Sequence, residues 1–262
     1  MAQGYIESKA NMELEVIAEE YFEKLAIAHH LHLKISKEMQ CLESIYCAKN
    51  LRTLFLLSCD WYYRHMLLSN SFHHFKYAVE NLIHLRCLHM LWRVQIEELL
   101  ETFCNLYNLQ TLIFECSYIS KLSQGMSKQI NLRHLIFHKY DDNHYDDLGE
   151  VVFPKGIGKL IGLRTLSVFN ISDKDDREGC KLGELKNLNQ LRGTFTINGM
   201  RNVANVNEAQ NAQLKDKINL RGLVLSYETA DVGDNEVGIS EMEKFLKEKS
   251  RMENDVKVLN AL

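Results

Sequence analysis

The stretch Leu106–Phe137, LYNLQTLIFECSYISKLSQGMSKQINLRHLIF, contains one short pattern twice. The pattern is Leu-x-x-Leu-x-apolar, and its two copies begin at Leu109 and Leu132. The copies lie about 23 residues apart, within the period of roughly 20–29 residues that is typical of stacked repeats built on short strands. One such unit cannot bury its own apolar face, so neighbouring units must stack to make a continuous core. The stretch therefore predicts a repeat protein.

The same pattern recurs along the chain at irregular spacing. The first leucine of each copy gives the markers Leu51, Leu85, Leu109, Leu132, Leu163, Leu188 and Leu220. By subtraction, the successive gaps are 34, 24, 23, 31, 25 and 32 residues. The longer gaps predict insertions, and Gly193, at the third apolar position of its repeat, predicts a weak point in its strand. We expect an α/β fold, a leucine-rich-repeat solenoid with a curved parallel sheet on its concave face and helices and loops on its convex face.

Two regions are expected in the chain. Residues 1–28 form a helical segment, because Asn11–Leu25 has apolar residues at helical spacing. Residues 29–262 form the repeat domain with about seven irregular repeats, which begins where the period changes to alternation after His29. No further repeat and no polar closing unit follow Leu225. This predicts a repeat domain truncated at its C-terminal end, since terminal repeats ordinarily carry a capping face.

Composition narrows the class of protein and its location. The chain has 262 residues, of which 46% are hydrophobic and 25% charged, as in soluble folded proteins. A net charge of -4 and dispersed basic residues argue against nucleic-acid binding. No apolar run approaches the roughly 18 residues of a membrane span. Seven cysteines without a Cys-x-x-Cys pair, and an N-terminus without an apolar signal core, predict free thiols and a cytoplasmic location.

No catalytic, cofactor-binding or metal-binding residue is predicted, and we expect no enzymatic activity. The segment from Gly156 to Lys159 resembles a phosphate loop, but its spacing is wrong and Leu160 stands where a magnesium-binding hydroxyl is needed. It is better explained as a repeat turn. His138 and His144 flank two aspartates at a spacing that matches no standard metal site. No serine or cysteine lies in a glycine-flanked nucleophile elbow.

The concave face carries the candidate site. Residues between the buried leucines of each strand point away from the core and should line one continuous sheet surface. These candidates for a protein-binding face are Thr53, Phe55, Cys87, His89, Thr111, Ile113, His134, Ile136, Thr165, Ser167, Gly222 and Val224. Apolar patches with polar rims often mark protein contacts. A ladder of arginines is also expected, able to receive an acidic surface or simply solvated, from Arg52, Arg86, Arg133, Arg164 and Arg221.

Three segments resemble the repeat region of plant intracellular disease-resistance proteins of the coiled-coil, nucleotide-binding (NB-ARC), leucine-rich-repeat type. They are IEELLETFCNLYNLQTL at Ile96–Leu112, FPKGIGKLIGLRTLSVF at Phe153–Phe169 and CKLGELKNLNQLRGTFTINGMRNV at Cys180–Val203. The opening MAQGYIESKANMELEVIAEEYFEKLA is similar to the last helices of that family's winged-helix element, so residues 1–28 would be its remnant. The phosphate loop of the family's ATP/ADP site has no counterpart here. The resemblance therefore implies no bound cofactor.

The resemblance implies a non-catalytic recognition module of a plant innate immune receptor, with a role in sensing pathogen effectors and in the defence response. The implied partners are proteins: a pathogen effector, a guarded host protein or a nucleotide-binding receptor domain. Two alternatives stay open. One is a leucine-rich-repeat adaptor of an ubiquitin ligase, and the other is a truncated receptor product without independent function.

Overall fold

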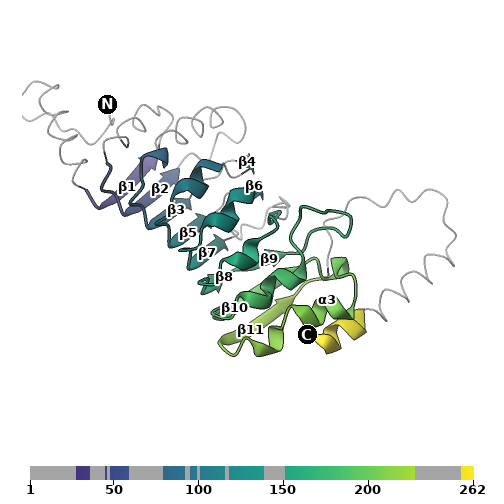
Figure 1. Cartoon of the computed structure of the whole chain (residues 1–262). Helices are drawn as coiled ribbons and strands as arrows, with labels where there is room; N and C mark the ends of the chain where they lie inside the picture. The colour runs from purple at the N-terminus through teal and green to yellow at the C-terminus, as the bar shows by residue number, and fades with distance from the viewer. Residues whose placement is uncertain are drawn as a thin grey trace, which may run out of the picture.

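The computed structural model describes most of the repeat region and the C-terminal segment. The described residues are 28–35, 45, 48–58, 79–91, 95–98, 101–115, 118–138, 151–227 and 255–262. The helical segment predicted at residues 1–28 therefore lies, apart from Ala28, outside the described residues. Figure 1 shows the strands side by side from β1 to β11, with short helical turns along the opposite side of the row.

Six strands form the main sheet, and all of their pairings are parallel. In spatial order they are β1 (His30–Ile35), β2 (Thr53–Ser58), β3 (Cys87–Leu91), β5 (Thr111–Glu115), β7 (His134–His138) and β8 (Thr165–Leu166). Equivalent leucines of neighbouring repeats align in this register and are fully buried, for example Leu88, Leu112 and Leu135. The predicted parallel sheet of stacked repeats is confirmed.

A second, three-stranded sheet continues the row, and a two-stranded sheet lies apart from both. The second sheet contains β9 (Val168–Asn170), β10 (Gly193–Asn198) and β11 (Leu220–Leu225), paired in parallel through β10. The two-stranded parallel sheet contains β4 (Gln95–Glu98) and β6 (Tyr118–Lys121).

The main and second sheets meet at Ser167, where the chain changes its pairing partner. Thr165 and Leu166 pair with β7, whereas the residues after Ser167 pair with β10. The Ser167 hydroxyl accepts a hydrogen bond from the Phe137 amide at 2.8 Å and donates one to the Phe137 carbonyl at 3.2 Å. The side chain thus takes over backbone hydrogen bonds at the end of β7. We call this junction, together with the start of β10, the seam.

The structure corrects one repeat boundary. The Arg192 amide donates to the Arg164 carbonyl at 2.8 Å, just as the Arg164 amide donates to the Arg133 carbonyl at 2.7 Å. Leu191, which precedes Arg192, is therefore the equivalent of Leu163, and the assignment of Leu188 as the marker is wrong. Leu188 and Leu191 are both buried and lie three residues apart, so the sequence pattern alone could not decide which of them is the marker. The corrected gaps around Leu191 are 28 and 29 residues, within the repeat period.

Short turns form the convex layer. Those with 3₁₀ geometry are η2 (Glu101–Asn105), η3 (Gln124–Lys128), η4 (Ile157–Lys159), η5 (Leu182–Asn187), η6 (Met200–Asn202) and η7 (Leu214–Asp216). One α-helix of six residues, α3 (Val206–Asn211), lies between η6 and η7. Its N-cap Asn205 accepts a hydrogen bond from the Glu208 amide, which supplies a partner for a free N–H of the first turn.

Between the sheets and the convex layer runs a row of phenylalanine rings. Phe114 and Phe137 stack with centroids 5.4 Å apart, and Phe153 lies 5.9 Å from Phe137 and 5.7 Å from Phe169. Phe195 continues the row 6.4 Å beyond Phe169. The rings lie within the range at which aromatic pairs attract one another. We call these five residues the phenylalanine row; it links the core of the main sheet to that of the second sheet.

The C-terminal segment contacts the same core. Residues 255–261 are helical, and Val258 is buried in the core cluster. Burial and the nearby charge of Asp255 raise the pKa of Tyr227, which follows β11. The C-terminal residues therefore lie near the end of β11.

Candidate protein-recognition site on the concave face

The main sheet aligns nine of the predicted site residues in two neighbouring columns. In the first column, adjacent strands pair in the order Thr53, Cys87, Thr111, His134 and Thr165. The second column contains Phe55, His89, Ile113 and Ile136. All nine side chains are partly exposed. Because neighbouring strands are about 4.8 Å apart, each column is a nearly continuous strip of side chains.

Strand β1 extends both columns with residues that the sequence reasoning did not include. His30 pairs with Thr53 and His32 pairs with Phe55, and both histidines are exposed. Alternation of Leu31 and Leu33 with these histidines was the signal that could have found them.

Ser167 and Val224 do not join these columns. The Ser167 hydroxyl bonds to the backbone of β7 at the seam. Val224 lies in the second sheet, opposite Thr196, and is 50% exposed. Gly222 lies opposite Thr194 on the same pair of strands. The prediction of one continuous sheet is therefore wrong: an additional residue between the core positions Leu166 and Phe169 divides it.

Three rings lie side by side along the second column. The His32 and Phe55 rings stack with centroids 4.3 Å apart, and Phe55 meets His89 edge-on at 5.1 Å. On the other side of His89, its Nε2 lies 3.1 Å from Glu115 Oε1, an ion pair when the imidazole is protonated. Phe55 is thus an apolar centre held between two imidazoles. These residues are far apart in sequence and could not be associated without the sheet register.

His134 lies in the first column beside two arginines of the ladder. Its Nδ1 is 3.0 Å from Thr165 Oγ1. Burial, and then the positive charges of Arg164 and Arg133, lower the pKa of the imidazole. Each of these effects disfavours the protonated ring.

We predict that His134 makes the folded chain less stable below neutral pH. Its pKa is lower in the folded state than the ordinary 6.5, so between these two values the unfolded state binds more protons. Stability is therefore lost as the pH falls below 6.5. Urea unfolding at pH 7.5 and pH 5.5 should show a smaller loss for His134→Gln than for the wild type. An equal loss in both proteins would contradict this role of His134.

The convex turns are capped by carboxylates from neighbouring repeats. Glu184 accepts hydrogen bonds from the Gly156 and Gly158 amides, each at 2.9 Å. Glu208 accepts from the Leu182 amide at 3.2 Å and from the Ala204 amide at 2.9 Å. The amides of the segment that resembles a phosphate loop are therefore already occupied by a carboxylate of the next repeat.

Other reactive groups of the described residues are buried or scattered. Cys87, Cys104 and Cys180 are free thiols, and burial raises the pKa of Cys104 to about 11. Within the described residues, no group of three or more His, Cys, Asp and Glu side chains could hold a metal ion. The loop that contains His144 lies outside the described residues. No helix in the described part is long and apolar enough to cross a membrane.

Comparisons with known proteins agree with this geometry. The family described as "Leucine-rich repeat region" matches residues 32–254. A "Putative disease resistance protein RGA1" of Solanum bulbocastanum is 43% identical over 75 residues, which cover 29% of this chain and 7% of the relative. The chain thus spans only a small part of that relative's length.

Two solved structures also match parts of the chain. A leucine-rich-repeat protein of Leptospira interrogans has 14% identity and a TM-score of 0.46, with 80% of this chain and 57% of that chain covered. Internalin C2 of Listeria monocytogenes has 15% identity and a TM-score of 0.47, with 78% and 83% covered. From the match over residues 32–254, the chain belongs to the leucine-rich repeat region family.

Proposed function

We propose that the concave face of the main sheet binds a protein partner, as the recognition region of a disease-resistance receptor. The observation that carries this proposal is the second column. Phe55, Ile113 and Ile136 form a partly exposed apolar strip in register with His89. The first column places polar hydroxyls and an imidazole beside it. An apolar strip with a polar border is typical of protein contact sites.

The kind of fold supports the proposed role, and the resemblance to disease-resistance proteins supports the proposed partners. Repeat solenoids present extended concave surfaces for binding, so the proposed role is non-catalytic and needs no bound cofactor. The proposed partners are a pathogen effector, a guarded host protein or a nucleotide-binding (NB-ARC) receptor domain, and the proposed location is the cytoplasm. The name of the Solanum relative supports this role over that of an ubiquitin-ligase adaptor.

We predict that Ile113→Thr with Ile136→Thr weakens partner binding by about 30-fold, since two apolar contacts of about 1 kcal/mol each would be lost. Threonine is β-branched like isoleucine and suits a strand. The measurement is the affinity of the full chain for a panel of pathogen effectors and receptor nucleotide-binding domains.

The matched control replaces two isoleucines outside the concave columns. Ile130 and Ile161 are 67% and 61% exposed, and their change to threonine should leave affinity within about twofold. Equal losses of partner affinity in the two double variants would contradict the proposal that the concave strip is the binding face. Unchanged affinity in the Ile113→Thr, Ile136→Thr variant would also contradict it.

A further inference from the structure

A hollow of about 680 Å³ opens at the seam, where β8, β10 and β11 come together. The residues that matter for its chemistry are Thr165, Arg192, Gly193, Thr194, Asn219 and Arg221. Among the described residues that line it, two are cationic and none is acidic. The hollow therefore combines positive charge with hydroxyl and amide groups. We call it the seam pocket.

The seam pocket exists because the first column has no side chain at Gly193. The hydrogen bond from the Arg192 amide to the Arg164 carbonyl puts Gly193 in the position that Thr165 has one strand earlier. Gly193 has a φ of 79°, which favours glycine, and a Cβ at this position would meet no atom within 4 Å. On the next strand, Leu220 pairs with Gly193 and also lines the hollow. The missing side chain at Gly193 alone leaves open space in the column.

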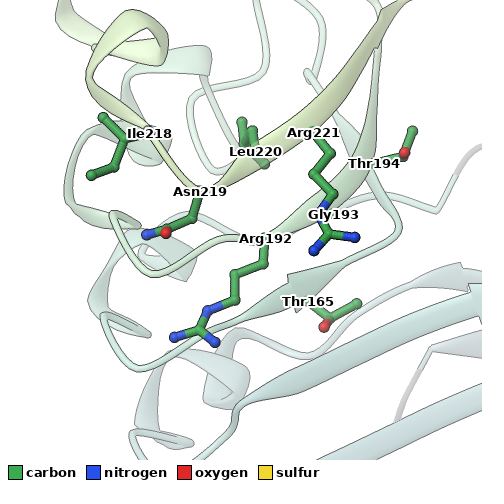
Figure 2. Close-up of a pocket in the computed structure, with 8 residues that line it drawn as sticks. All are labelled: Thr165, Arg192, Gly193, Thr194, Ile218, Asn219, Leu220 and Arg221. Carbon is green, nitrogen blue, oxygen red and sulfur yellow. The ribbon is translucent and has the colours of Figure 1, made fainter.

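The two arginines border this space. Figure 2 shows the side chains of Arg192 and Arg221 both below their strands in this view, with the Arg221 guanidinium beside Gly193 and the Arg192 guanidinium extending outward, away from Thr165. Both arginine residues are exposed, and within the described part of the chain no carboxylate forms an ion pair with either. A guanidinium group presents five N–H donors in a fixed fork that matches the oxygens of phosphate or carboxylate. The Thr165 hydroxyl, which also contacts His134, adds a neutral group at the edge.

We propose that the seam pocket binds a phosphate group carried by a side chain of the protein partner. A phosphate monoester offers three free oxygens and a charge of about −1.5 to −2, which suits two cationic forks better than the two oxygens and single charge of a carboxylate. The net charge of -4 favours a single anionic group over an extended nucleic-acid backbone. The identity of the macromolecule rests on the proposed function, but binding of the anion does not. The pocket would add charge recognition beside the apolar strip of the concave face.

The first test uses inorganic phosphate and the full 262-residue chain at constant ionic strength. Calorimetry or NMR titration should show saturable binding. Arg192→Gln with Arg221→Gln should weaken it at least tenfold. The matched control is Arg52→Gln with Arg86→Gln, which removes the same charge from the ladder at β2 and β3 and should change affinity less than twofold.

An equal loss of phosphate affinity in the two arginine-to-glutamine double variants would mean that the charge of the whole ladder, and not the seam pocket, binds phosphate. Absence of saturable phosphate binding by the wild type would also overturn the proposal. Arg192→Lys with Arg221→Lys keeps the charge but removes the forks, and we expect an intermediate loss. Unfolding midpoints equal to that of the wild type establish that each variant is folded.

The second test identifies the source of the phosphate. A short peptide with one phosphoserine should bind at least tenfold more tightly than its unphosphorylated copy, and this gain should vanish in Arg192→Gln, Arg221→Gln. Tighter binding of an oligonucleotide of similar charge would overturn the assignment to a protein partner. The Ile113→Thr, Ile136→Thr variant should bind inorganic phosphate like the wild type. Failure of the concave strip and failure of the seam pocket are therefore distinguishable.

Discussion

Replacing Phe153 with alanine should destabilise the folded chain by about 3–5 kcal/mol, the usual cost of removing a buried phenylalanine ring. Phe153 has no exposed surface and is the middle member of the phenylalanine row. Its ring contacts Phe137 on one side and Phe169 on the other. The substitution removes both aromatic contacts and leaves a cavity at the level of the seam. Urea unfolding followed by circular dichroism measures the loss.

The position of Phe153 also predicts how the variant should unfold. In a solenoid each repeat is stabilised by its nearest neighbours, so a cavity in one interface weakens the coupling between the repeats on either side. We expect a lower slope of unfolding free energy against urea, or two separate transitions, in Phe153→Ala. Phe153→Leu, which keeps most of the apolar volume, should lose less than half as much. The control Ile161→Ala, on a side chain that is 61% exposed, should stay within about 0.5 kcal/mol of the wild type. A loss in Phe153→Ala no larger than this control would contradict the role of the row.

The regular part of the fold was predictable because each repeat carries the same local information. Strands β2, β3, β5 and β7 each have a buried leucine followed two positions later by another apolar residue, and this alternation by itself determines which side chains reach the concave face. Ile113 and Ile136 could thus be assigned to that face from the sequence. Their pairing in one column follows once the equivalent leucines are aligned.

The seam was not predictable because it depends on the register in which neighbouring strands pair, and several registers fit the sequence about equally well. The core residues Leu166 and Phe169 lie three positions apart, whereas strict alternation would place them two apart. This was a weak sign of an additional residue. Only the change of partner at Ser167 and the hydrogen bond from Arg192 to Arg164 decide the register. Arg192 was omitted from the arginine ladder for the same reason.

Contacts between repeats on the convex side leave still less trace in the sequence. Ser123 caps η3 by accepting a hydrogen bond from the Gly125 amide, and its hydroxyl is bonded to Glu101. The partners Glu101 and Ser123 belong to different repeats. Nothing in the residues around Glu101 distinguishes a capping carboxylate from a solvated one, because the distinction lies in the next repeat.

Replacing Glu184 with alanine should destabilise the folded chain by about 2 kcal/mol, because two backbone amides would lose a charged acceptor. Gly158 is buried, so water could not replace the carboxylate as the hydrogen-bond acceptor of its amide. Glu184→Gln keeps an acceptor oxygen and should lose about half as much. Lys186→Ala, on an exposed side chain in the same turn, should stay within about 0.5 kcal/mol. Chemical unfolding at pH 7 compares the four proteins.

Gly158 provides a further test of this contact. A Cβ at Gly158 would overlap the Glu184 carbonyl oxygen and lie 2.8 Å from Oε2, so Gly158→Ala should push η4 away from η5 and break the same hydrogen bonds. Once η4 has moved, the hydrogen bonds to the Glu184 carboxylate are already lost, so removing the carboxylate has little further effect on stability. The combined variant should therefore cost at least about 1 kcal/mol less than the sum of the single variants. Strict additivity would mean that the carboxylate and the glycine act independently, and the inter-repeat cap would not be the source of the stability.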